Sequence, residues 1–191
     1  MSDKDIQRKT LSLLHTVTAA LPQAEERQGQ NEMAVAIALA VDTKRHLIVQ
    51  AGTGTGKTLG YLVPLIASGK RVVVSTYTKA LQDQLAANDL PLLADVLGKE
   101  LQRHISWAVL KGRSNYICAQ RVDEIANPKH TKLDLETTPA KVTKEVARLT
   151  EWAAQTDTGD QGDLTWSPSD QAWRMVSVGS DECPGAQRCP A

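Results

Sequence analysis

The chain has few of the residues from which aromatic cores and membrane spans are built. Its 191 residues include four Trp, three Tyr and no Phe, so any core must consist mainly of aliphatic side chains and alanine. Apolar residues make up 41% of the chain, which is enough for a globular core. No apolar run approaches the ~20 residues of a membrane-spanning helix. The polar N-terminus, residues 1–5, is not followed by a signal-peptide core. We therefore expect a cytoplasmic protein with no membrane segment.

Net charge is also lacking. The chain has 22 Lys and Arg against 22 Asp and Glu, a formal net charge of zero, so its overall charge points to no particular partner. The charge is unevenly distributed, however. Basic residues are in excess over residues 103–148, whereas Arg174 is the only Lys or Arg in the acidic stretch 151–182. A local basic groove for nucleic acid remains compatible with this pattern, and we expect the acidic stretch to face away from it.

Cysteine is scarce, but its placement is informative. Cys118 stands alone, whereas Cys183 and Cys189 lie in a Pro- and Gly-containing loop near the end of the sequence. Disulfides are rare in cytoplasmic proteins, so clustered thiols favour a metal or iron–sulfur site. Three thiolates are one short of the usual four ligands. Zinc, completed by His104 or His130, is the alternative.

The most informative motif is the sequence AGTGTGKT at residues 51–58. An apolar run, 47–49, precedes it, and leucines at helical spacing follow it. Strand, glycine-rich loop and helix are the context that a phosphate-binding P-loop requires. Lys57 would reach the β- and γ-phosphates of a nucleotide, and Thr58 would bind Mg²⁺. The remaining phosphate-binding positions are Gly52, Thr53, Gly54, Thr55 and Gly56, whose backbone N–H groups would face the anion at the start of a helix.

Hydrophobic periodicity predicts an α/β fold for the first part of the chain. Short apolar strands are expected at residues 46–50, 71–75 and 107–110, with helices between them. This order predicts a parallel sheet covered by helices. Beyond Gly112 no buried strand is evident, and helices are expected near residues 116–125 and 142–154. We therefore divide the chain into a P-loop domain at 1–111 and a mostly helical inserted domain at 112–191.

Three further groups of residues are candidates for ligand contacts. Upstream of the P-loop, Arg27 and Gln30 form the pattern R-x-x-Q, in which the glutamine either reads an adenine edge or simply faces solvent. Hydroxyl and basic side chains follow the second predicted strand and precede Cys118. Because the carboxyl ends of parallel strands face the ligand, these groups could contact a nucleic-acid backbone. They are Thr76, Thr78, Lys79, Lys111 and Arg113, although Thr78 also suits a helix N-cap. Tyr116 either offers a stacking surface for a base or packs internally.

The combination of R-x-x-Q, AGTGTGKT, STxTxxLQxQL and LKGRSNYxC resembles the DinG/XPD-type iron–sulfur DNA helicases of superfamily 2. The resemblance extends from about residue 24 to residue 191. It implies an incomplete RecA-like motor domain over 1–111 and an iron–sulfur domain over 112–191. It also implies ATP and Mg²⁺ as cofactors, with Lys57 and Thr58 as catalytic residues and Arg27 and Gln30 near the nucleotide. A [4Fe–4S] cluster would take Cys118, Cys183 and Cys189 as its first three ligands, so these cysteines should converge in space.

The implied activity is ATP-driven translocation on single-stranded DNA and unwinding at duplex junctions, in DNA repair or replication. The Asp-Glu-Ala-His motif, a fourth cysteine and a second motor domain do not occur in the 191 residues. The expectation is therefore an N-terminal fragment that is inactive in isolation. Two alternatives stay open: a different P-loop NTPase with incidental cysteines, and a zinc-binding interaction module.

Overall fold

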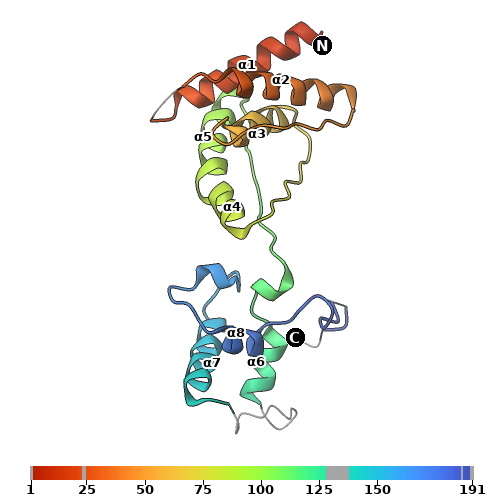
Figure 1. Cartoon of the computed structure of the whole chain (residues 1–191). Helices are drawn as coiled ribbons and strands as arrows, with labels where there is room; N and C mark the ends of the chain where they lie inside the picture. The colour runs from red at the N-terminus through yellow and green to blue at the C-terminus, as the bar shows by residue number, and fades with distance from the viewer. Residues whose placement is uncertain (1, 23–24, 128–137, 186, 190–191) are drawn as a thin grey trace. The chain divides into compact units, whose positions relative to one another are not determined.

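The computed structural model describes residues 2–22, 25–127, 138–185 and 187–189. The chain separates into two compact units, Met1–Val109 and Leu110–Ala191 (Figure 1). Each unit has a hydrophobic core of its own.

The first unit is built from helices that pack through aliphatic side chains. α1 (Asp3–Ala19) begins at a capping box formed by Ser2 and Asp5. It packs against α2 (Gln28–Thr43) and α3 (Lys57–Ala67). Three further helical segments follow one another without a break: α4 (Lys79–Gln84), the π-helix η1 (Leu85–Asp89) and α5 (Leu90–Glu100). The largest fully buried side chains in this core are Leu14, Val17, Val63, Leu93 and Leu97.

The segments predicted as strands are extended, but they form no β-ladder within the described residues. The apolar side chains of these segments remain largely exposed: Ile48 is 97% exposed and Val73 91%. Residues 70–72 and 103–109, with α3, η1 and Leu90, line a cavity of about 490 Å³. The predicted hydrogen-bonded parallel sheet is therefore not confirmed. A strand requires a partner about 4.8 Å away, and an apolar run in a sequence does not reveal whether that partner is present.

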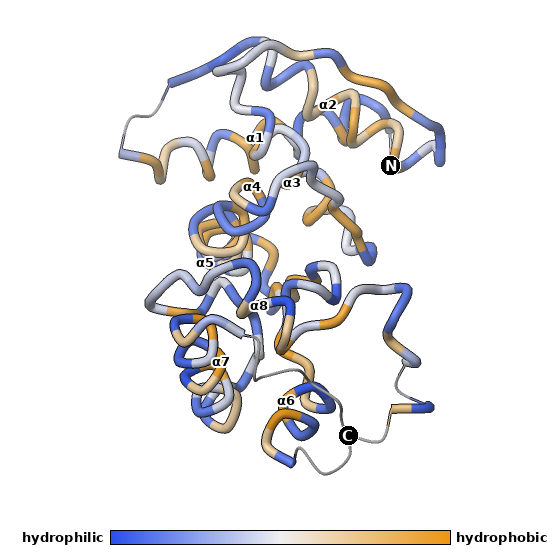
Figure 2. The backbone as a smooth tube through the Cα atoms, turned by 60° about the horizontal axis from the view of Figure 1, so that its bottom comes forward, coloured by the Kyte–Doolittle hydropathy of each residue, from blue (hydrophilic) through white to orange (hydrophobic). Residues whose placement is uncertain are grey.

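The second unit contains three helices in its described residues. They are α6 (Ala119–Ala126), α7 (Ala140–Ala153) and α8 (Asp170–Val176), with 3₁₀ turns at Arg113–Asn115 and Gln161–Asp163. Helices were expected near α6 and α7, whereas α8 was not predicted. Apolar and polar stretches alternate along α7 (Figure 2), and Val146 and Leu149 of this helix pack with Trp173 and Val176 of α8.

Residues 116–118 are extended rather than helical, which corrects the predicted start of the first helix in this unit. Tyr116 forms an isolated antiparallel bridge with Asp160, and Ile117 forms one with Ser177. The backbone N–H of Tyr116 bonds to Arg113 in the preceding 3₁₀ turn, whereas those of Ile117 and Cys118 bond to Gly159 and Val176, in distant parts of the unit.

Candidate nucleotide and nucleic-acid site

The P-loop lies where the sequence places it, in the turn that leads into α3. Gly56 is the N-cap of this helix, with a left-handed φ of 72°. Thr55 donates its hydroxyl proton to the carbonyl of Gly52 across 3.0 Å, which closes the loop on itself. Gly52, Thr53 and Gly54 are exposed. The loop thus leaves its backbone accessible at the positive end of α3, the arrangement that favours phosphate binding.

The Lys57 side chain folds back over this loop. Its ammonium group lies 2.6 Å from the carbonyl oxygen of Gly52 and 3.3 Å from that of Ala51. Lys57 is exposed and Thr58 half-buried, one turn before the core residue Leu62. The ammonium can therefore turn towards an anion without disturbing the core.

Gln30 lies against the P-loop rather than in solvent. It is 4% exposed, and its Nε2 donates to the carbonyl oxygen of Gly56 across 2.7 Å. Arg27 pairs with Glu25 across 2.9 Å at the surface. A cavity of about 180 Å³ adjoins both residues of the R-x-x-Q pattern, lined also by α1 residues Leu11, His15 and Thr18. The solvent-facing alternative for Gln30 is therefore wrong, and its Nε2 is bonded to the loop.

The helix after the P-loop carries a tyrosine that sequence reasoning did not single out. Tyr61 packs partly buried against the core and hydrogen-bonds to the Thr58 side chain. Burial, and the nearby charge of Asp89, raise the pKa of Tyr61. Burial also raises the pKa of Asp89, whose Oδ2 is buried without a hydrogen-bond partner. Asp89 closes the π-helix η1, and π-helical turns are frequent near functional sites.

The hydroxyl and basic groups after residue 75 lie in and just before the first turn of α4. Thr78 is the N-cap of this helix, and its hydroxyl accepts from the backbone N–H of Leu81 across 3.3 Å. Thr76 donates to the carbonyl of Thr78 across 3.2 Å. Lys79 is exposed at the first helical position. The N-cap role predicted for Thr78 is confirmed, and contact with nucleic acid stays a prediction for all three residues.

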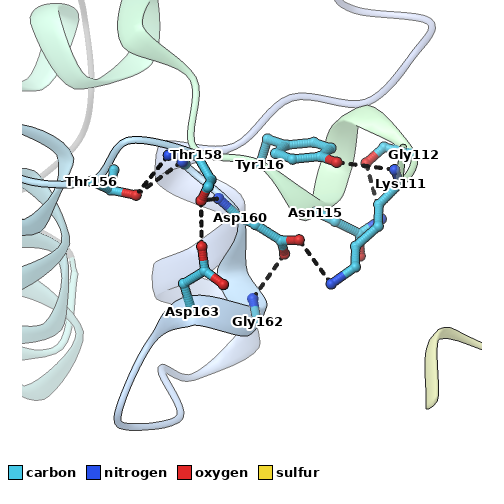
Figure 3. Close-up of polar contacts among 10 residues, drawn as sticks. Lys111, Gly112, Asn115, Tyr116, Thr156, Thr158, Asp160, Gly162 and Asp163 are labelled. Atoms are coloured by element: carbon cyan, nitrogen blue, oxygen red, sulfur yellow. Dashed lines mark hydrogen bonds and ion pairs between the residues drawn. The ribbon is translucent and has the colours of Figure 1, made fainter. Parts of the chain in front are cut away.

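The two basic residues of the Lys111–Cys118 segment have different environments. The Lys111 ammonium lies 2.8 Å from Asp160 Oδ2, and the side chains of these residues are 7% and 14% exposed. Arg113 is exposed. The Tyr116 hydroxyl accepts from the backbone N–H of Lys111 across 3.0 Å (Figure 3), so Tyr116 packs internally.

The three cysteines come from segments that contact one another. Cys118 is the N-cap of α6. In the first turn of this helix, Gln120 Oε1 lies 3.9 Å from Cys189 Sγ, and Arg121 lies 3.7 Å from Glu182. All three thiols are free and half-buried. Even so, the described residues contain no assembled group of three or more metal-ligating side chains. His104 belongs to the first unit, and His130 lies outside the described residues.

A comparison with protein families agrees with the P-loop at the start of α3. Residues 28–149, which include the P-loop and the Lys111–Cys118 segment, match the family described as DEAD/DEAH box helicase. The chain belongs to this helicase family. Membership implies a RecA-like P-loop fold for the first unit. Within the described residues of this family member, no helix is both long enough and apolar enough to span a bilayer.

Curated relatives of this DEAD/DEAH box family member confirm the resemblance to DinG-type helicases. The ATP-dependent helicase DinG of Mycobacterium tuberculosis is 45% identical over 93% of the chain. The ATP-dependent DNA helicases YoaA and DinG of Escherichia coli are 40% and 34% identical over 90% and 85% of the chain. The chain spans 28%, 25% and 24% of the lengths of these three proteins.

Sequence reasoning missed Asp160 and Asp89 as site residues, for different reasons. Asp160 lies in the acidic stretch that was expected to face away from the DNA path, and no periodic pattern marks its pairing with Lys111 across 49 positions. Asp89 precedes Leu90 and Pro91, which is typical of a helix start. The structure instead continues the helix through a π-turn at this point. The three-residue spacing of Thr58 and Tyr61 is the one local signal that could have been used.

The orphaned carboxylate of Asp89 predicts a pH-dependent stability. Because its pKa is raised in the folded chain, folding favours its protonated form. The contribution of Asp89 to the free energy of unfolding is therefore greatest below its ordinary pKa and is lost as pH rises through the raised one. We expect Asp89→Asn to stabilise the chain by about 1 kcal/mol or less at neutral pH. The gain should shrink to nothing in acid, as urea denaturation at several pH values would show.

The matched control is Asp95→Asn on the same helical layer. Asp95 is exposed and pairs with Lys99 across 2.7 Å, a type of contact that contributes little to stability. Its replacement should therefore give no gain at any pH. A stability gain for Asp89→Asn that is the same at acidic and neutral pH would contradict the assignment.

Proposed function

We propose that this chain is the N-terminal part of an ATP-dependent DNA helicase of the DinG type, working in DNA repair or replication. The observation that carries the proposal is the P-loop at the start of α3, with Lys57 held over the loop by two backbone carbonyls. The family match, and the helicase names of the relatives at 34–45% identity, support it.

The proposed chemistry begins with ATP and Mg²⁺ at this loop. The backbone of Gly52–Gly56, of which Gly52, Thr53 and Gly54 are exposed, would surround the phosphates, and Lys57 would exchange its carbonyl partners for the β- and γ-phosphates. Thr58 offers its hydroxyl to Mg²⁺. Gln30 supports the loop through its hydrogen bond to the carbonyl of Gly56. A cavity lined by Arg27, Gln30 and residues of α1 lies beside Gln30. Hydrolysis also requires a group that positions water and positive charge at the transition state, which we infer to come from the rest of a longer protein.

The proposed DNA path follows the residues after each extended segment. We infer that residues 46–50, 71–75 and 107–110 become strands of a RecA-like sheet in that longer protein. Thr76, Thr78 and Lys79 would then lie at the carboxyl edge of the sheet, where they would contact the backbone of single-stranded DNA. Arg113, in the second unit, is a separate candidate for contact with the DNA backbone. The preferred substrates are single strands and duplex junctions.

The second unit is proposed to bind a [4Fe–4S] cluster through Cys118, Cys183 and Cys189. Thiolates are the usual ligands of such clusters, and the contacts of α6 with Glu182 and Cys189 bring the segments that carry these residues together. The cluster would supply a soft metal centre that cross-links the two ends of the unit. The donor chemistry therefore fits, although the three thiols are not assembled into a ligand set.

The proposal is tested with the full-length protein that contains this chain. We expect ATP hydrolysis that single-stranded DNA stimulates, together with strand separation on a forked duplex. Hydrolysis that is indifferent to DNA would favour a different P-loop NTPase. Metal analysis of the same preparation should find iron and acid-labile sulfide, with less iron in a Cys118→Ser variant. Zinc in place of iron would favour the interaction module.

A further inference from the structure

We propose that Lys111 and Asp160 form an internal positioning pair that presents Arg113 to the phosphates of single-stranded DNA, and that Lys111 itself makes no DNA contact. The inference rests on the proposed DNA-binding function. It gives the two basic residues of one motif separate roles, and it assigns a role to Asp160.

The ion pair between these residues is deeply placed and well bonded. Lys111 Nζ lies 2.8 Å from Asp160 Oδ2, with 7% and 14% of the two side chains exposed. The other carboxylate oxygen of Asp160 accepts the backbone N–H of Gly162 across 2.9 Å (Figure 3). A Cβ added at Gly162 would lie 3.0 Å from Lys111 Nζ, so the ammonium is tightly enclosed. To reach a phosphate, Lys111 would have to leave Asp160 as an uncompensated charge, which is strongly unfavourable in a buried position.

The pair fixes the start of a turn whose other residues are also bonded. The backbone N–H of Lys111 donates to the hydroxyl of Tyr116 across 3.0 Å. Asn115 donates to the carbonyl of Gly112 through both its backbone N–H and its Nδ2, each across 2.9 Å. The indole N–H of Trp173, in α8, donates to the carbonyl of Ser114 across 2.7 Å. The turn around Arg113 is therefore held by hydrogen bonds among its flanking residues and by one from Trp173 of α8.

The chain beyond the turn is held equally firmly. Ile117 donates its backbone N–H to the carbonyl of Gly159 across 2.8 Å, and Cys118 donates to that of Val176 across 2.7 Å. Thr158 and Gly159 both donate backbone N–H groups to the Thr156 hydroxyl, which stabilises the loop that carries Asp160. Lys111 and Asp160 thus close a ring of bonds that runs through the turn and returns along this loop.

Arg113 is the basic residue that this ring leaves at the surface. Arg113 is exposed, and it forms no ion pair within the part of the chain that the structure describes. Because the backbone of the turn is already ordered, binding costs little further backbone entropy there, and a guanidinium group can form two parallel hydrogen bonds to a phosphate. Lys111 also neutralises the nearby Asp160 carboxylate, which would otherwise repel the DNA backbone.

The test separates contact from positioning through the salt dependence of DNA affinity. The full-length protein is titrated with a fluorescent oligo-dT strand at several salt concentrations. The slope of log affinity against log salt is negative, and each lost phosphate contact should make it shallower by about 0.7 for a single strand. We expect this reduction for Arg113→Ala. We expect the wild-type slope for Lys111→Met/Asp160→Asn, which removes both charges and leaves neither uncompensated. Arg174→Ala, an exposed arginine on α8, is the matched control and should change nothing.

Lys111→Met alone should weaken binding at every salt concentration, because it exposes the turn to the charge of Asp160. The added Asp160→Asn should restore the affinity, and this rescue is not expected if Lys111 contacts DNA. If Lys111→Met fails to fold, the double variant answers the question by itself. The inference is overturned if the salt dependence becomes shallower in the double variant, or if it is unchanged in Arg113→Ala. Failure of the wild-type protein to bind the strand would instead overturn the proposed function.

Discussion

Replacement of Lys57 by alanine should abolish ATP hydrolysis in the full-length protein. The ammonium of Lys57 lies on the P-loop carbonyls of Ala51 and Gly52, at the position from which it can turn to the β- and γ-phosphates. Loss of one preorganised group that stabilises transition-state charge lowers kcat by roughly 10²–10³-fold. We expect a reduction of at least this size in phosphate release measured with saturating ATP and single-stranded DNA.

The fold should survive this substitution, because Lys57 is exposed and contacts no core side chain through its charged end. Lys99→Ala is the matched control. Lys99 is an exposed lysine on α5 that pairs only weakly with Asp95 at the surface, and its loss should leave hydrolysis unchanged. A folded Lys57→Ala protein with near-normal hydrolysis would remove this lysine from the nucleotide site.

The P-loop could be predicted from sequence because its information is local. Eight consecutive residues specify the turn, its two left-handed glycines, Gly54 and Gly56, and the helix that follows. Gln30 shows the limit of such reasoning. Its neighbours suggest a role near a nucleotide, but only the three-dimensional structure shows that its amide bonds to Gly56, 26 residues along the chain. The same holds for Lys111, whose sequence context indicates a basic turn residue and whose partner is Asp160.

The predicted sheet depended on information that is not local. Apolar runs at residues 47–49 and 72–74 are typical of buried strands, yet these side chains are exposed in the structure. A buried parallel strand needs neighbours on both edges and helices on both faces, and the sequence of one strand specifies none of them. The helices were easier to predict, because the i, i+3 and i+4 spacing of their apolar residues lies within each element. α8 was missed because its seven residues provide too few periods.

A second large effect is expected for Gly56→Ala. Gly56 has a φ of 72°, where an L-residue with a Cβ is strained. An added Cβ would lie 2.2 Å from Gln30 Nε2 and 2.9 Å from Gln30 Cδ, so the buried Gln30 side chain would have to leave the carbonyl it bonds. Strain of about 1–2 kcal/mol and a lost hydrogen bond of about 1 kcal/mol should together destabilise the first unit by about 2–3 kcal/mol. Urea denaturation of the chain measures this change.

Gly52→Ala supplies the matched control within the same loop. Gly52 has no left-handed φ, and nothing lies within 4 Å of an added Cβ, so its replacement should leave the free energy of unfolding nearly unchanged. The double variant Gln30→Ala/Gly56→Ala removes the steric conflict but keeps the backbone strain. It should therefore be less destabilised than the sum of the two single variants. If Gly56→Ala proved as stable as Gly52→Ala, the close packing of Gln30 against the P-loop would not exist in solution. Gln30 would then be free to face a bound base instead of supporting the loop.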